Sequence, residues 1–164
     1  ADARRASPSG GLRSGIDAVR QAAPRVMRAL DTNVLARFFV DDPDDPQAAR
    51  QRPAAIAALS ERAYVPITVL LELEWVLRGF YALPAKDVVR VLRALAGIEH
   101  VTLEDRDAVL TAIDACERGL DFADALHVAR SARASAFVTF DRRLAKRARM
   151  LALPLPVALL GRGA

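Results

Sequence analysis

The chain has 164 residues, of which 52% are hydrophobic and 27% are charged, so it can bury the core of one compact domain. Its single cysteine, Cys116, cannot form an intramolecular disulfide, and no apolar run approaches the roughly 20 residues that span a bilayer. These features exclude a disulfide-stapled secreted module and an integral membrane protein. No apolar stretch of about 7 to 15 residues follows the first arginines, so we expect no secretory signal and a cytoplasmic location.

The net charge of +4 comes mostly from the N-terminal segment. Residues 1–26 contain five arginines and two aspartates, which leaves 19 basic and 18 acidic side chains in residues 27–164. Binding to a polyanion therefore cannot be predicted from net charge and needs a local patch. Residues 1–26 mix Ser, Gly, Pro and Arg without a helical or strand period. We predict a tail over residues 1–26, disordered or not native, and one domain over residues 27–164.

Hydrophobic periodicity and turn residues predict strands that alternate with helices. In chain order, the first half is predicted to contain a strand at 26–30, a turn-rich loop at 41–46, a helix at 46–62, a strand at 64–67, and helices at 68–80 and 84–96. The second half is predicted to contain a strand at 100–103, helices at 105–118 and 121–134, a strand at 136–140, a helix at 141–150 and a strand at 155–159.

Capping residues support several of these boundaries. Asp45 followed by Pro46 fits an N-cap and a first helical position, and Thr68 and Asp121 fit N-caps of later helices. Strands that alternate with helices imply parallel β-α-β units. The predicted fold is therefore an α/β three-layer sandwich with a central, mainly parallel sheet flanked by helices. In such sheets the site lies at the carboxyl ends of the strands.

Four carboxylates are predicted to gather at that edge. Asp31 and Asp141 each follow a predicted strand directly, so both would sit on the same edge of one sheet, and Glu72 and Asp124 lie in the first turns of helices that flank it. Four acids in one cleft repel unless a cation neutralises them or some hold protons. Oxygen ligands of this kind suit Mg²⁺ or Mn²⁺. Each acid alone could equally be a turn or cap residue, but the four together favour a metal site.

The helix after Thr68 carries two glutamates on opposite flanks of its apolar stripe, so only one of them can face the site. Glu74 has Arg78 four residues later, which predicts a surface ion pair. Glu72 has Val76 at the same spacing and no such partner. Glu72 is therefore the predicted ligand.

The four acids lie in motifs that resemble those of PIN-domain nucleases. The motifs are DTN at 31–33, ITVLLELEWVLRGF at 67–80, DFADALHVA at 121–129 and FVTFD at 137–141. They follow the order and spacing of the family, and the resemblance extends from Met27 to about Leu160. The amino-acid sequences of these motifs are most similar to those of VapC-type toxins of bacterial type II toxin-antitoxin pairs.

The resemblance implies a metal-dependent endoribonuclease that hydrolyses RNA phosphodiester bonds and uses Mg²⁺ or Mn²⁺. Asp31 and Asp124 would be direct ligands, and Glu72 and Asp141 would bind through water or orient the attacking water. A cognate antitoxin and a homodimer are the implied protein partners.

Other polar residues lie close to the predicted cluster. Asn33 and Thr139 each lie two residues from a cluster aspartate and could support it by donating a hydrogen bond. The basic segment 141–149 could pair with RNA phosphates, or it could be a solvated helix face. Its candidate RNA-binding residues are Arg142, Arg143, Lys146 and Arg147. Asp121 could be a fifth acid but is favoured as a cap, and His127 is predicted to be structural.

Two other function classes remain open. An aspartate-dependent phosphohydrolase would use Asp31 as a nucleophile, but haloacid-dehalogenase-type enzymes carry a second aspartate two residues later, where this chain has Asn33. A non-catalytic PIN-like module would bind RNA or a peptide and keep only the fold. The complete set of four acids favours catalysis over the second alternative.

Overall fold

The computed structural model describes residues 26–161, in which short parallel strands alternate with helices. The strands are β1 (Arg28–Ala29), β2 (Ala63–Val65), β3 (Val101–Leu103), β4 (Phe137–Thr139) and β5 (Val157–Leu159). The helices are α2 (Thr32–Phe39), α3 (Pro46–Leu59), α4 (Ile67–Trp75), the π-helical turn η1 (Val76–Phe80), α5 (Ala85–Gly97), α6 (Arg106–Glu117), α7 (Phe122–Arg130) and α8 (Arg142–Leu151). The predicted tail over residues 1–26 lies outside the described residues except for Val26. Within the described range, no helix combines the length and the apolar character needed to cross a membrane.

The strands are parallel, which confirms the predicted α/β class, but they lie in two sheets. One sheet has the order β1-β2-β3, with Ala63 of β2 opposite both Arg28 and Val101. The other sheet contains β4 and β5, with Phe137 opposite Val157. The strands that precede Asp31 and Asp141 therefore belong to different sheets, contrary to the prediction that both acids share one sheet edge.

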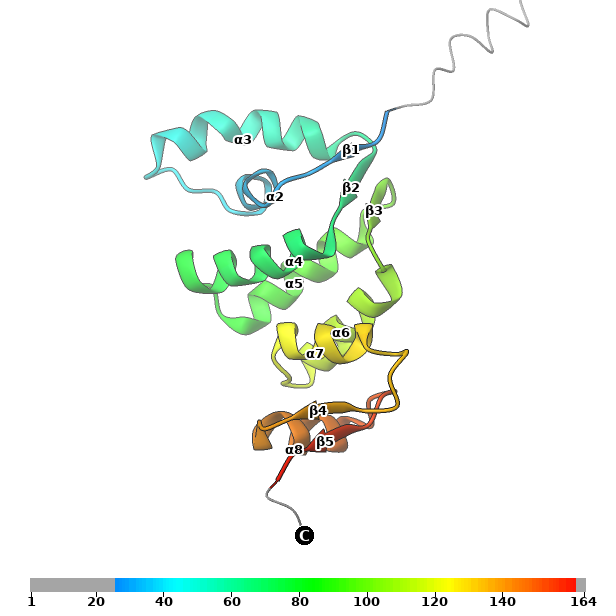
Figure 1. Ribbon diagram of the computed structural model, residues 1–164. Helices are drawn as coiled ribbons and strands as arrows, with labels where there is room; N and C mark the ends of the chain where they lie inside the picture. Colours follow the sequence, from blue (N-terminus) through cyan, green and yellow to red (C-terminus); the bar gives the residue numbers. More distant parts are fainter. Residues whose placement is uncertain (1–25, 162–164) are drawn as a thin grey trace, which may run out of the picture.

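The position of α8 accounts for this separation. Figure 1 shows α2, α3 and β1 at one end of the molecule, α4 to α7 in the middle, and β4, β5 and α8 at the other end. Leu144 and Ala148 of α8 are buried in the main hydrophobic core, to which Leu120 and Phe122 also belong. Burial of these side chains holds the C-terminal unit against the middle of the molecule, far from β1.

Helix α2 is absent from the sequence-based prediction. Two residues separate α2 from β1, and α2 has only eight residues, about two turns. This length contains too few apolar positions to show a helical period in the sequence. Leu35 and Ala36 are buried, and Phe38 and Phe39 pack against the core. Such a short helix draws its stability from packing rather than from its own propensity.

The predicted caps are confirmed in two places and wrong in one. The carboxylate of Asp45 accepts a hydrogen bond from the Gln47 N–H (2.8 Å), and that of Asp121 accepts one from the Ala123 N–H (3.0 Å). Helix α4 instead starts at Ile67, with Pro66 in the N-cap position and no side-chain cap, so Thr68 does not cap it. Helix α7 also ends earlier than predicted, at Arg130.

Candidate active site

The first pair of candidate acids lies where β1 and α4 meet α2. Asp31 is exposed at the N-cap of α2, and its side chain makes no capping hydrogen bond. Glu72 is exposed on α4, and its carboxylate accepts a hydrogen bond from the buried hydroxyl of Thr32 (2.5 Å). Because Thr32 follows Asp31 directly, this bond fixes Glu72 beside the N-terminus of α2. Asn33 is also exposed and lines, with Asp31, a hollow of about 390 Å³ between α2 and α3.

The second pair lies where α7 and α8 begin. Asp124 is partly buried in the first turn of α7. Burial raises the pKa of Asp124, and the negative charges of Asp121 and Asp141 raise it further. Asp141 caps α8, because its carboxylate accepts hydrogen bonds from the N–H groups of Arg143 (2.7 Å) and Leu144 (3.1 Å). Asp141 is thus one of the negative charges that act on Asp124, after burial and Asp121.

Thr139 supports Asp141 through the backbone. Its hydroxyl accepts a hydrogen bond from the N–H of Asp141 (2.9 Å), so it orients the start of α8 and not the carboxylate itself. The sequence predicted that Thr139 donates a hydrogen bond, and this is wrong for the bond that the structure shows, because the hydroxyl is the acceptor.

The two pairs of acids do not form one cluster in the chain. Across residues 26–161, no three side chains of His, Cys, Asp or Glu are close enough together to hold a metal ion. Asp31 and Glu72 lie with the three-stranded sheet, whereas Asp124 and Asp141 lie with the C-terminal unit. The carboxylates of a single chain in this arrangement therefore do not fit a divalent metal ion, which needs several oxygen ligands at one point.

Two further acids of the same region have structural roles. Glu74 forms the predicted ion pair with Arg78 (3.1 Å), but its side chain is buried, so the prediction of a surface pair is wrong in this respect. Burial raises the pKa of Glu74, and Arg78 opposes this shift. Asp121 caps α7 and also pairs with Arg78 (3.1 Å), which confirms its predicted capping role.

Basic side chains follow Asp141 along α8. Arg142, Arg143, Lys146 and Arg147 are all exposed on α8, which begins at Asp141. None of these four takes part in an ion pair with another residue in the described part of the chain. His127, predicted to be structural, is exposed on α7 and lowers the pKa of Asp124.

Sequence reasoning missed the role of Thr32. This residue is 3% exposed, and it is one of two buried polar or charged residues in the described chain. Its position in the DTN motif, between Asp31 and Asn33, is the signal that could have identified it. Without a view of the packing between α2 and α4, nothing in the sequence connects it with Glu72.

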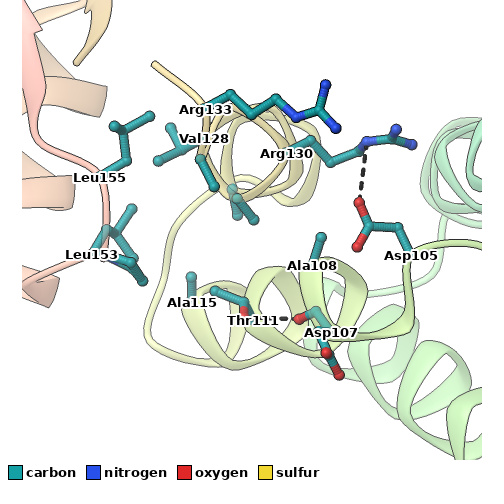
Figure 2. Close-up of a pocket in the computed structure, with 14 residues that line it drawn as sticks. Asp105, Asp107, Ala108, Thr111, Ala115, Val128, Arg130, Arg133, Leu153 and Leu155 are labelled. Atoms are coloured by element: carbon teal, nitrogen blue, oxygen red, sulfur yellow. Dashed lines mark hydrogen bonds and ion pairs between the residues drawn. The ribbon is translucent and has the colours of Figure 1, made fainter. Parts of the chain in front are cut away.

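A cavity of about 860 Å³ lies away from these acids, between α6, α7 and the segment before β5 (Figure 2). Small and aliphatic side chains line much of its wall (Figure 2). Arg130, the last residue of α7, and Arg133, in the segment after α7, also line it. Arg130 pairs with Asp105 (3.4 Å). Because none of the four candidate acids lines this cavity, it does not mark the candidate active site.

The chain was compared with known proteins and protein families. The model of the PIN domain family matches residues 28–150, a range that includes all four candidate acids. No curated protein and no solved structure matches the chain. PIN domains are generally nucleases and typically use divalent metal ions. Because the match covers more than half of the sequence, the chain belongs to the PIN domain family.

Proposed function

We propose that the chain is an endoribonuclease that hydrolyses RNA phosphodiester bonds in the presence of Mg²⁺ or Mn²⁺. The observation that carries this proposal is the family match, which includes Asp31, Glu72, Asp124 and Asp141. In the proposed roles, Asp31 and Asp124 would be the direct metal ligands, which requires the two acidic pairs to come closer together than they lie in the structure. Glu72 and Asp141 bind through water or orient the attacking water.

The polar neighbours of these acids suit a site that positions its groups before the reaction. Thr32 holds the carboxylate of Glu72, and Thr139 orients the segment that carries Asp141. Asp31 makes no capping bond, so its carboxylate is free of the helix that follows it. A catalytic carboxylate must be held close to the groups on which it acts. A side chain that its neighbours already hold in place loses less conformational entropy when the reaction occurs.

Helix α8 is the proposed RNA-binding element. Its exposed basic side chains begin directly after Asp141, so they would contact phosphates next to a candidate catalytic acid. A phosphodiester is an anion, and the acids alone would repel it. Arg142, Arg143, Lys146 and Arg147 supply the opposite charge, and we expect RNA affinity to fall steeply with salt.

We further propose that the chain is the toxin of a toxin-antitoxin pair in the cytoplasm, with a cognate antitoxin and a second copy of the chain as partners. A basic side chain of an antitoxin would be attracted to the acids and could block them. Induced expression in a bacterial host should arrest growth, and Asp31→Asn with Asp124→Asn should restore it. Growth arrest that persists in this double variant would contradict the toxin role.

The proposed ribonuclease activity is tested with purified protein and a pool of structured RNAs. The pool is incubated with Mg²⁺, with Mn²⁺ and with EDTA, and cleavage is followed on denaturing gels. The test variant combines Asp31→Asn with Asp124→Asn, and the control is Asp44→Asn, an exposed acid in the loop before α3. We expect metal-dependent cleavage by the wild type and the control, and none by the test variant.

A non-catalytic RNA-binding module is the second candidate, because the acids of one chain lie in two separate pairs. RNA that is bound but uncut under every metal condition would support this module and overturn the nuclease proposal. Cleavage that persists in EDTA or in the double variant would contradict the assigned acids.

A further inference from the structure

The hollow between α2 and α3 lies next to the candidate acid Asp31. Its volume of about 390 Å³ is at the lower end of the roughly 300–1,000 Å³ that small-ligand sites occupy. Figure 1 shows the two helices beside each other at the end of the molecule that carries β1. Helix α2 contributes Asn33, Val34 and Arg37 to the lining, and α3 contributes Gln51 and three alanines. A group bound in the hollow would therefore lie beside Asp31.

The apolar part of the lining consists of small side chains, namely Val34, Ala54, Ala55 and Ala58. Small side chains leave room for a flat group, and apolar walls favour a group with apolar faces. A phosphate has no such face, and the negative charge of Asp31 would repel it. A nucleobase has two apolar faces and a polar edge, so it fits the hollow better than a phosphate does.

Arg37 is held in one orientation at this hollow. Its guanidinium donates hydrogen bonds to the hydroxyl of Tyr81 (2.7 Å), the side-chain oxygen of Gln51 (3.3 Å) and the carboxylate of Asp45 (3.2 Å). Its side chain is only 17% exposed, although it is charged. Because three partners fix the planar guanidinium and Asp45 opposes its charge, Arg37 orients its neighbours instead of following a mobile anion.

Gln51 is the neighbour whose orientation matters for a bound base. Its side-chain oxygen accepts from Nε of Arg37, and its NH₂ group can only donate. A base amino group that approached this oxygen would meet the N–H groups of Arg37. A base carbonyl would be attracted by the NH₂ group of Gln51 and by the positive charge of Arg37. Gln51 therefore favours a base whose edge carries a carbonyl oxygen.

The four RNA bases fall into two classes at this edge. Guanine and uracil carry a carbonyl oxygen at the position where adenine and cytosine carry an amino group. One neutral hydrogen bond changes an affinity by about two- to tenfold, which is the discrimination that Gln51 can supply. Asn33 is exposed, and its amide has both a donor and an acceptor, so it can bond to either class.

We propose that the hollow binds one nucleobase of the RNA substrate and that Gln51, oriented by Arg37, selects guanine or uracil over adenine or cytosine. This inference rests on the proposed action on RNA and names a site that determines its base specificity. Because Asp31 lines the same hollow as Gln51, a phosphate attached to the bound nucleotide would lie next to this acid. The selected base would therefore stand beside the bond that is cut.

Binding without cleavage tests the base preference first. Oligouridine and oligocytidine of equal length match in ring size and differ in whether the edge carries a carbonyl or an amino group. Each is labelled with fluorescein and titrated with the full chain in EDTA, and binding is followed by fluorescence anisotropy. We expect the wild type to bind oligouridine about two- to tenfold more tightly. Equal affinities, tighter binding of oligocytidine, or no binding of either RNA would overturn the proposal.

A variant of Gln51 tests which side chain makes the selection. Gln51→Glu keeps an oxygen for Nε of Arg37 but replaces the NH₂ donor with an acceptor, so the preference should shift toward oligocytidine. Gln47→Glu is the matched control, because it makes the same change at an exposed position one turn earlier on α3, outside the lining of the hollow. The control should weaken both RNAs equally and leave their ratio unchanged. A ratio that changes in both variants, or in neither, would overturn the role of Gln51.

A larger side chain tests whether the base enters the hollow. Ala54 is exposed on α3 and lines the hollow, so Ala54→Phe should fill the space and bring the two affinities together. Ala57→Phe is the control, since Ala57 is also exposed on α3 but lies outside the lining, and it should keep the wild-type ratio. Circular dichroism checks that both variants keep the helical content of the wild type. A wild-type ratio in folded Ala54→Phe would overturn the site.

Sequencing of cleaved RNA ends separates this inference from the nuclease proposal. With Mn²⁺ and a pool of random sequences, the wild type should enrich guanine and uracil at one position beside the cut, and Gln51→Glu should shift that position alone. A preference for oligouridine without any cleavage would support the base site and contradict the nuclease function. Cleavage with no base preference beside the cut would support the nuclease function and overturn the base site.

Discussion

The hydrogen bond from Thr32 to Glu72 offers a direct test of how the first acidic pair is positioned. Its hydroxyl donor is 3% exposed and its carboxylate acceptor is exposed, with 2.5 Å between the two oxygens. Thr32→Val removes the donor, Glu72→Ala removes the acceptor, and the double variant closes a thermodynamic cycle. Single variants would mislead, because valine also gains apolar burial at this position.

The expected coupling energy follows from the geometry. Hydrogen bonds to charged groups contribute about 1.5–3 kcal/mol when both partners are shielded from water. Here the Glu72 carboxylate is exposed, so water can solvate it once the Thr32 hydroxyl is removed. This solvation compensates for part of the free energy of the lost hydrogen bond. We therefore expect Thr32 and Glu72 to couple by about 1 kcal/mol in the free energy of unfolding, above the roughly 0.3–0.5 kcal/mol at which distant sites still appear additive.

Urea unfolding of the wild type, the two single variants and the double variant measures this coupling energy. RNA cleavage by Thr32→Val then shows whether the hydrogen bond matters for activity. Thr32→Ser is the control, because it keeps the hydroxyl and loses only a methyl group. We expect Thr32→Ser to preserve both the coupling and the activity that Thr32→Val loses. A coupling energy within about 0.3 kcal/mol of zero would refute the claim that Thr32 holds Glu72.

Three further predictions concern stability. The pKa of Asp124 is raised above 3.8, so its ionisation opposes folding as the pH rises from 3.8 through the folded-state value. Asp124→Asn should therefore raise Tm at neutral pH and leave it unchanged below the unfolded pKa, as calorimetry would show; a lower Tm at neutral pH would contradict this. Arg78→Gln should cost about 1–3 kcal/mol at neutral pH by leaving the buried Glu74 carboxylate without its cation. That loss should shrink in urea titrations as the pH falls and Glu74 takes up a proton; a loss independent of pH would point to packing instead. Leu144→Ala should cost about 2–5 kcal/mol, because Leu144 is 4% exposed and attaches α8 to the core; unfolding unchanged within error would show that α8 is not anchored there.

The sequence predicted the elements of the fold better than their spatial order. The strands and most helices lie within a few residues of their predicted positions, because turn residues and helical spacing are local signals. Helix α2 was missed, since its two turns are too short for a clear period. Strand order is a different kind of property: nothing local in FVTFD determines whether β4 lies beside β1 or only beside β5.

The candidate site shows the same division between local and long-range information. The capping role of Asp121 and the ion pair between Glu74 and Arg78 join residues close in sequence, and both were predicted. A hydrogen bond between Thr139 and Asp141 was also expected, but with Thr139 as the donor, whereas its hydroxyl is the acceptor. The burial of Glu74 and the bond from Thr32 to Glu72 depend on how α2, α4 and α7 pack, and neither was predicted.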